Sequence, residues 1–108
     1  MTFDSSLEVN EIMNLIKNRW GVTYELIIMA KGKSLYLQMM WGFLEKQSLH
    51  LTDEEYRKKL AKVLDVVNRL GASSKVRRWL LNIDGKPILG RALSLHLEGD
   101  WRLAEFVL

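Results

Sequence analysis

The clearest element in this sequence is an amphipathic helix that follows Thr52 and ends at Gly71. Thr52 and Glu55 have the spacing of a capping box, in which each side chain accepts a hydrogen bond from the backbone N–H of the other residue. Apolar residues then recur at helical intervals on one face: Tyr56, Leu60, Val63, Leu64, Val67 and Leu70. We therefore expect this helix to pack its apolar face against the rest of a compact domain.

Two shorter helices are predicted from the same kind of signal. Residues 6–20 carry apolar residues at helical spacing after Ser5 and Glu8, a second capping-box pair, and Gly21 follows as a left-handed stop. Residues 75–82 follow two serines, either of which is a suitable N-cap, and also show an apolar face.

Two segments have the composition of β-strands. Residues 22–30 are β-branched, aromatic or apolar, which predicts a strand covered on both faces at its end. Residues 89–98 alternate, which predicts a half-buried strand. On one side lie Leu89, Leu93, Leu95 and Leu97, and on the other Ala92, Ser94, His96 and Glu98.

Residues 34–47 are predicted as a helix, with Ser34 as its cap after the turn Lys31-Gly32-Lys33. This helix is apolar on nearly every side, and only Gln38, Gly42 and Glu45 form a narrow polar stripe. A helix that is apolar all round is usually buried, so we expect it at the centre of the fold. The predicted fold class is α+β, with a small two-stranded sheet packed by three to five helices.

Length and composition set the class of protein. With 108 residues, 48% of them hydrophobic and 27% charged, the chain is expected to form a single domain over residues 1–108 with a flexible N-terminus of about residues 1–5. It has no cysteine, which excludes disulfides, thiolate nucleophiles and Cys-ligated metal sites. The N-terminus lacks the features of a signal peptide, and no apolar run reaches the roughly eighteen residues of a membrane span. We therefore expect a cytoplasmic protein.

The segment Gly32-Lys33-Ser34 follows a strand and resembles the end of a phosphate-binding loop. That loop also needs a glycine five positions before the second glycine, because backbone amides must wrap the phosphates, and Ile27 stands there. Nucleotide hydrolysis is therefore not predicted. Free amides at a helix start, with Lys31 and Lys33, would leave a weaker candidate anion site. A plain turn is the preferred interpretation.

Catalytic and metal signals are weak throughout. His50 and His96 are the two histidines, and neither has a histidine or carboxylate three or four positions away on the same helix. No nucleophile elbow or dinucleotide-binding motif occurs. We predict no catalytic residue, no metal site and no cofactor. An enzyme site assembled from distant polar residues is the third-ranked hypothesis.

Positive charge is concentrated in the second half of the chain. Residues 1–56 carry five Lys or Arg against eight Asp or Glu, whereas residues 57–108 carry eleven against five. Four helical pairs at i, i+4 neutralise part of this charge, namely Asp53–Arg57, Glu54–Lys58, Glu55–Lys59 and Asp65–Arg69. The less easily neutralised residues are Lys75, Arg77, Arg78, Lys86 and Arg91. These five form the candidate patch for nucleic acid or another anionic partner.

A second candidate surface is apolar. Met39, Met40 and Trp41 are consecutive, and three consecutive residues span about 200° of a helix, so a small domain has difficulty covering all of them. Methionine and tryptophan exposed together make an adaptable surface for binding proteins. The alternative, in which all three belong to the core of a central helix, is the favoured one.

Several stretches of the sequence resemble a known family. They are Trp20-Gly21-Val22-Thr23-Tyr24, Gly32 to Trp41, Leu44-Glu45-x-Gln47-Ser48, Glu54-Glu55-Tyr56 and Leu89 to Leu95. Over roughly residues 10–98 the chain resembles the domain-of-unknown-function family 3067 of cyanobacteria and chloroplast-bearing eukaryotes. The resemblance implies no activity, cofactor or site residue. The family's distribution implies a photosynthetic organism and an accessory or assembly role.

The leading hypothesis is a non-enzymatic protein-interaction module that uses the Met39–Trp41 surface and the basic patch. Its partner is then another protein. The alternative is a nucleic-acid-binding protein that uses the basic patch alone. The sequence does not predict an oligomeric state.

Overall fold

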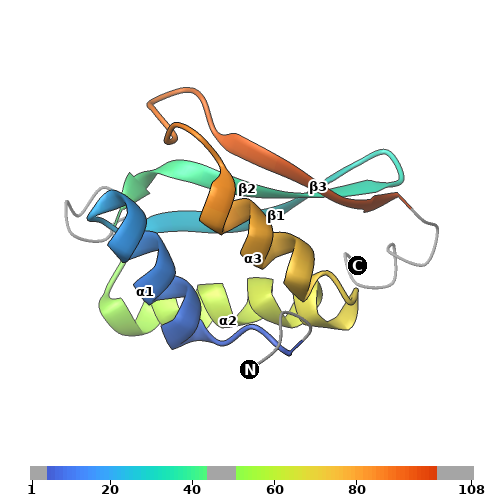
Figure 1. The fold of residues 1–108 in the computed structure, drawn as a ribbon, viewed down its shortest axis with the longest axis horizontal. Helices are drawn as coiled ribbons and strands as arrows, with labels where there is room; N and C mark the ends of the chain where they lie inside the picture. Colours follow the sequence, from blue (N-terminus) through green and yellow to red (C-terminus); the bar gives the residue numbers. More distant parts are fainter. Residues whose placement is uncertain (1–4, 44–50, 100–108) are drawn as a thin grey trace.

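The computed structural model describes residues 5–43 and 51–99 of the chain. Its elements, in chain order, are α1 (Val9–Trp20), β1 (Tyr24–Lys31), β2 (Ser34–Phe43), α2 (Asp53–Arg69), α3 (Ser73–Asn82) and β3 (Leu93–Gly99). The strands form an antiparallel sheet in the order β1-β2-β3. The helices lie together on one side of this sheet (Figure 1). The fold class is therefore α+β, as predicted.

The helix predicted over residues 34–47 is wrong in the part that the structure describes, because residues 34–43 form β2. Lys31 and Ser34 pair across a hairpin, and Gly32 in the connection between them has a φ of 62°. Tight hairpin turns need a positive φ, which glycine adopts at little steric cost. Gly32-Lys33 is therefore a hairpin turn and Ser34 begins a strand. Residues 44–47 lie outside the described ranges.

β2 alternates between the core and the opposite side of the sheet. Its fully buried positions are Leu35, Leu37 and Met39, and its half-buried positions are Tyr36, Gln38 and Met40. This period of two is hard to recognise because the outward positions include Tyr36 and Met40, which are apolar enough to resemble a buried helix. Within the described ranges the sheet has three strands and not the predicted two, with β2 at its centre. The described residues contain three helices, within the predicted range.

The ends of α2 are confirmed. The Glu55 backbone N–H donates to Thr52 Oγ1 and the Thr52 backbone N–H donates to Glu55 Oε1, each at 3.1 Å. The hydrogen bond from Thr52 lowers the pKa of Glu55 below its usual value. After the helix, Gly71 takes a left-handed φ of 70°. Both signals in the sequence therefore act as expected.

The other two predicted caps are wrong. α1 begins at Val9 with Glu8 as its N-cap, and Glu8 makes no side-chain capping hydrogen bond. Ala72 is the N-cap of α3, again without a side-chain bond, so Ser73 is already inside the helix. Gly21 does end α1 in a left-handed conformation, with φ 80°. The existence of both helices is confirmed although their starts differ.

β3 is shorter than predicted. It begins at Leu93, and from there Leu97 is buried while Ser94 and His96 are exposed, as the alternation predicts. Leu89 was expected on the buried side but lies before the strand and is 78% exposed. The cause is a tight turn in which Ile88 pairs with Arg91.

The hydrophobic core lies between the inner face of the sheet and the helices. The residues that the helices contribute include Ile12, Ile16, Tyr56, Leu60, Leu64, Val67, Val76 and Leu80.

None of the helices in the described ranges has the length and hydropathy to cross a membrane. The expected C-terminal turn around residues 101–106 and most of the expected flexible N-terminus lie outside these ranges.

Candidate functional site

An exposed hydrophobic surface lies where the end of β2 meets the segment leading into β3. Trp41 is 42% exposed, Ile88 47% and Leu89 78%. Together with Met40 and Arg91 they line a hollow of about 360 Å³. These five residues are termed the Trp41 surface.

A tight turn holds Leu89 in solvent. Ile88 and Arg91 pair across it, and the backbone N–H of each donates to the carbonyl of the other at 3.0 and 2.9 Å. Gly90 has a φ of 81°, which an L side chain rarely adopts. Pro87, at the base of the turn, is fully buried. The exposure of Leu89 is therefore a consequence of the turn. The glycine after Leu89 is the signal by which the sequence indicates this turn.

The predicted Met39–Trp41 surface is divided by the strand. Neighbouring residues of a strand point to opposite faces. Met39 faces the helices and is completely buried, so its placement on a surface is wrong. Met40 is half-buried and lies on the other face. The pairing with β1 becomes irregular directly after it, because Glu25 pairs with Met40 but Tyr24 pairs with Phe43, and Trp41 there lines the same hollow as Met40, beside Ile88 and Leu89. A role in partner binding for Met40 and Trp41 stays a prediction.

Arg77, predicted as part of an exposed basic patch, is 5% exposed, and that placement is wrong. Its guanidinium binds both carboxylate oxygens of Glu11 on α1, with Nη2 2.9 Å from Oε1. It also donates to the carbonyls of Ser5 at 2.7 Å and Ser6 at 3.0 Å. The hydrogen bonds from Arg77 hold the pKa of Glu11 below its usual value. Arg77 therefore joins α3 to the start of α1.

The remaining candidate cations lie on three parts of the fold. Lys31 ends β1 and Lys33 lies in the hairpin turn, Lys75 and Arg78 lie on α3, and Lys86 and Arg91 lie between α3 and β3. Lys75 Nζ donates to the Leu97 carbonyl at 3.3 Å. Because a strand follows Lys33, the helix start on which the predicted anion site depended is not there. Binding of an anion or a partner by these residues stays a prediction.

Three of the four predicted helical ion pairs are present. They are Arg57–Asp53 at 2.9 Å, Lys58–Glu54 at 3.5 Å and Arg69–Asp65 at 3.1 Å. The predicted Glu55–Lys59 pair is replaced, because Glu55 serves in the capping box and Lys59 reaches Glu25 of β1 at 3.5 Å. The interpretation of α2 as largely self-neutralised is therefore confirmed with one change of partner.

Two aromatic rings lie together on the sheet face that points away from the helices. The rings of Tyr36 on β2 and His96 on β3 have centroids 5.1 Å apart. Beside them Gln38 Nε2 donates to Ser94 Oγ at 3.1 Å. Sequence reasoning missed this arrangement because it placed Tyr36 on a helix. Recognising the alternation of Leu35, Leu37 and Met39 is what would have revealed it.

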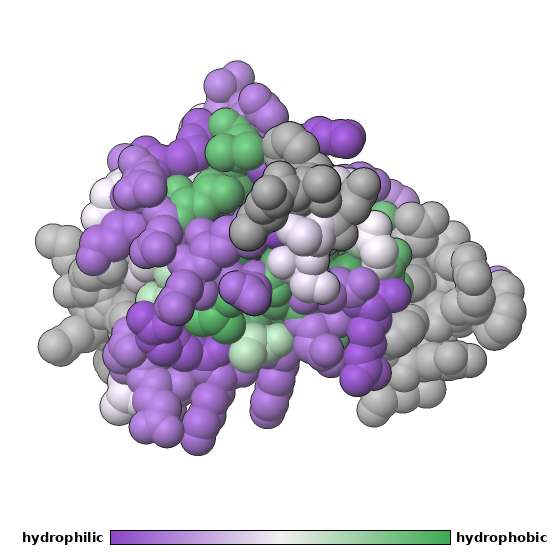
Figure 2. Space-filling model, turned by 60° about the horizontal axis from the view of Figure 1, so that its bottom comes forward, coloured by the Kyte–Doolittle hydropathy of each residue, from purple (hydrophilic) through white to green (hydrophobic). Residues whose placement is uncertain are grey.

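The opposite, helix-bearing side is mostly hydrophilic, with hydrophobic residues visible in smaller groups between polar ones (Figure 2). Across the described residues, His, Asp and Glu side chains form no group of three that could hold a metal ion. His50 lies outside the described ranges, and His96 packs on Tyr36.

Comparison with known proteins identifies a family and a similar structure. The family model described as "Domain of unknown function (DUF3067)" matches residues 10–107. No curated protein matches the chain. The solution NMR structure of the Alr2454 protein from Nostoc sp. strain PCC 7120 is similar, with a TM-score of 0.80 and 26% sequence identity. The match covers 94% of this chain and 98% of the Nostoc chain.

Proposed function

The chain belongs to the family described as a domain of unknown function (DUF3067), and on that premise we propose that it is a non-enzymatic protein-interaction module. Its partner binds the Trp41 surface, and the role is that of an accessory or assembly factor in the cytoplasm of a photosynthetic organism. The observation that supports binding is the joint exposure of Trp41, Ile88 and Leu89 around one hollow.

The composition of the Trp41 surface suits a protein interface. Tryptophan and arginine are enriched among the residues that contribute most binding energy, and Trp41 and Arg91 supply both. Burying an exposed leucine side chain such as Leu89 contributes about 1.5–3 kcal/mol. The turn holds Leu89 in place before binding, so little conformational entropy is lost there. A preformed turn next to an exposed tryptophan therefore favours a protein partner.

The test is affinity capture from the native host with the intact chain as bait, followed by quantitative mass spectrometry. Leu89→Ser is expected to lose the captured partner. Leu81→Ser is the matched control, because Leu81 is also an exposed leucine, 48% accessible, but lies on α3 outside the Trp41 surface. Equal loss with both variants, or retention by Leu89→Ser, contradicts the proposal.

Nucleic-acid binding is the second candidate, and the Tyr36–His96 ring pair favours it. Single-stranded nucleic acids stack their bases on aromatic side chains of open sheet faces. Lys31 and Lys33 lie at the hairpin between β1 and β2, a few residues before Tyr36, and could contact phosphates. Arg77 is buried and therefore contributes nothing to phosphate binding. Retention of RNA that falls log-linearly with salt, and is lost with Tyr36→Ala, supports this alternative. No retention at low salt excludes it.

A further inference from the structure

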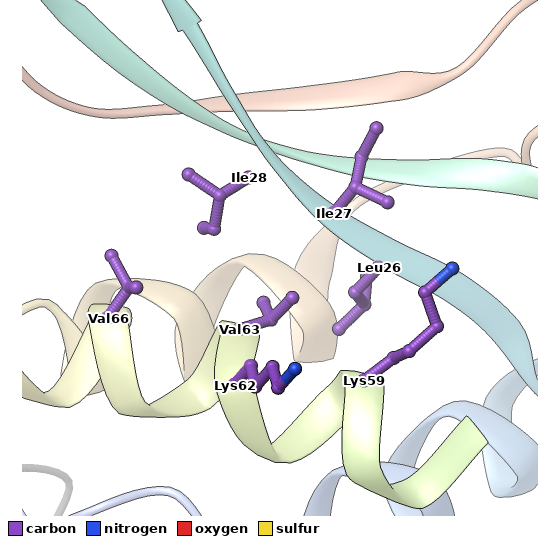
Figure 3. Close-up of a pocket in the computed structure, with 7 residues that line it drawn as sticks. All are labelled: Leu26, Ile27, Ile28, Lys59, Lys62, Val63 and Val66. Atoms are coloured by element: carbon purple, nitrogen blue, oxygen red, sulfur yellow. The ribbon is translucent and has the colours of Figure 1, made fainter. Parts of the chain in front are cut away.

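A second hollow lies between β1 and α2 and shares no residue with the Trp41 surface. It has a volume of about 320 Å³. Its lining is Leu26, Ile27 and Ile28 from β1 and Lys59, Lys62, Val63 and Val66 from α2. In Figure 3 Val63 and Val66 rise from the helix toward the strand, and Leu26 descends toward the helix. This β1–α2 groove is apolar except for its two lysines.

β1 is an edge strand. In the described part of the chain it has β2 on one side and no strand on the other. At its first residue the Tyr24 carbonyl is already used, because it accepts a hydrogen bond from the Tyr56 hydroxyl. The next residues, 26–28, line the groove. An exposed edge presents backbone N–H and C=O groups to which another extended chain can pair.

The charge of the groove is positive and incompletely paired. Lys59 has Glu25 at 3.5 Å, but its side chain remains 59% exposed. Lys62 is exposed and has no ion pair or hydrogen bond among the described residues. The other basic residues of α2, which are Arg57, Lys58 and Arg69, each pair with a carboxylate of the same helix. The unneutralised lysine of α2 thus lines the groove.

We propose that the β1–α2 groove binds an extended acidic segment of a partner protein. The segment adds to the free edge of β1 as a further strand, the mode known as β-augmentation. Its apolar side chains enter the space lined by Ile28, Val63 and Val66. Its carboxylates lie opposite Lys62 and Lys59.

The same lysines disfavour a second copy of this chain as the occupant. Antiparallel pairing of β1 with β1 of another copy would continue one sheet, with the two α2 helices on the same side. Lys59 and Lys62 of both copies would then meet across the junction, where like charges repel. Lysines beside an edge strand are a known barrier to edge-to-edge association. A carboxylate-bearing strand removes this repulsion, which is why the acidic segment is the better fit.

The direct test uses a short, end-blocked peptide in which every second residue, on the face that would meet α2, is in turn valine or glutamate, with threonine between them. This spacing is needed because neighbouring residues of a strand point to opposite faces, and both the valines and the carboxylates must face α2. Added to the intact, isotopically labelled chain, it is expected to shift the NMR signals of backbone amides in residues 26–30 and to protect them from hydrogen exchange. The same peptide with N-methyl groups on alternate amides keeps its charge and apolar side chains but cannot pair with a strand. It is expected not to bind. Equal binding of both peptides overturns strand addition.

A charge exchange tests the role of Lys62. Lys62→Glu is expected to weaken the glutamate peptide by about fivefold, the size expected when an attractive exposed ion pair becomes a repulsive one, and to strengthen a valine–lysine peptide. Lys58→Glu is the matched control, since it makes the same change of net charge on α2 outside the groove. Equal effects of the two variants show that binding follows net charge alone and overturn the proposal.

This inference stands apart from the Trp41 surface. The Leu89→Ser variant is expected to bind the glutamate peptide as tightly as the original chain. If Leu89→Ser binds the glutamate peptide with unchanged affinity, the result supports peptide binding in the β1–α2 groove. This holds even if the Trp41 surface captures no partner. Spectral shifts that scatter over the whole molecule, without a focus on residues 26–30, contradict it.

Discussion

Arg77 and Leu89 lie in surroundings opposite to those that their side chains usually prefer. Arg77 is charged and 5% exposed, whereas Leu89 is apolar and 78% exposed. Arginine is rarely buried unless it is paired, and here Glu11 and two carbonyls pair it. A turn through Gly90 holds Leu89 outward. Whether a side chain is buried or exposed thus depends on the partners that the fold places beside it and on the backbone conformation, as well as on its polarity. Arg77 accordingly contributes to stability, and Leu89 is available for binding.

Of the changes at the two compared sites, the largest effect is expected from Arg77→Met. This change leaves the Glu11 carboxylate and two carbonyls without their donor. The Glu11 side chain is 25% exposed, so breaking this partly buried ion pair is expected to cost about 2 kcal/mol. Urea denaturation followed by circular dichroism measures the free energy of unfolding. A loss below about 1 kcal/mol would show that the pair does not anchor α1 to α3.

A smaller loss of stability is expected at acidic pH, and its direction follows from the pKa of Glu11. Arg77 lowers the pKa of Glu11 in the folded chain, so the stabilisation is present above the unfolded value of 4.5 and is lost as pH falls through the folded pKa. Between neutral and acidic pH, the free energy of unfolding should therefore fall less in Arg77→Met than in the original chain. Glu55, whose pKa is also lowered, is present in both proteins and cancels in this difference. Parallel pH profiles would contradict the assignment.

Gly90→Ala tests the other side of the comparison. No atom lies within 4 Å of a Cβ placed on Gly90, so the cost comes from its φ of 81° alone. A left-handed conformation at an alanine costs about 1 kcal/mol, measurable by urea denaturation. If stability is unchanged, the turn does not fix Leu89, and its exposure has another origin.

Leu89→Ser is expected to change stability least, by no more than about 0.5 kcal/mol, because the side chain makes little contact with the core. Leu80→Ala is the buried counterpart on α3 and should cost about 2–5 kcal/mol. Thermal and urea unfolding of both variants provide the measurement. A large loss for Leu89→Ser would mean that Leu89 packs on the fold and is unsuited to bind a partner.

The predictability of these elements depended on how local their signals are. α2 could be predicted because Thr52, Glu55 and Gly71 mark its ends within the segment itself. β2 could not, because Ser34 after Gly32-Lys33 is equally suited to cap a helix or to leave a hairpin turn. Tyr36 and Met40 on its outer face hid the alternation. The segment forms a strand and not a helix because it pairs with both β1 and β3.

The candidate sites depended on contacts between distant positions. Trp41 was identified from its residue type, but its neighbours Ile88 and Leu89 come from another part of the chain. Glu11 is 66 positions from Arg77, so no local pattern indicates that Arg77 is buried. The β1–α2 groove likewise joins segments whose proximity only the fold establishes. The sequence therefore supplied residue types, and the fold supplied their combinations.

The central position of β2 also has a consequence for synthesis of the chain. β1 and β2 are neighbours in sequence and can close their hairpin early, whereas Gln38 and its partner Ser94 are 56 positions apart. While the ribosome is still adding the helical segment, one edge of β2 has no strand beside it. Contacts of such long range slow folding, and an unpaired apolar edge is prone to aggregate in the meantime. We expect nascent chains that stop before β3 to require a chaperone, whereas chains that include β3 can close the sheet unaided.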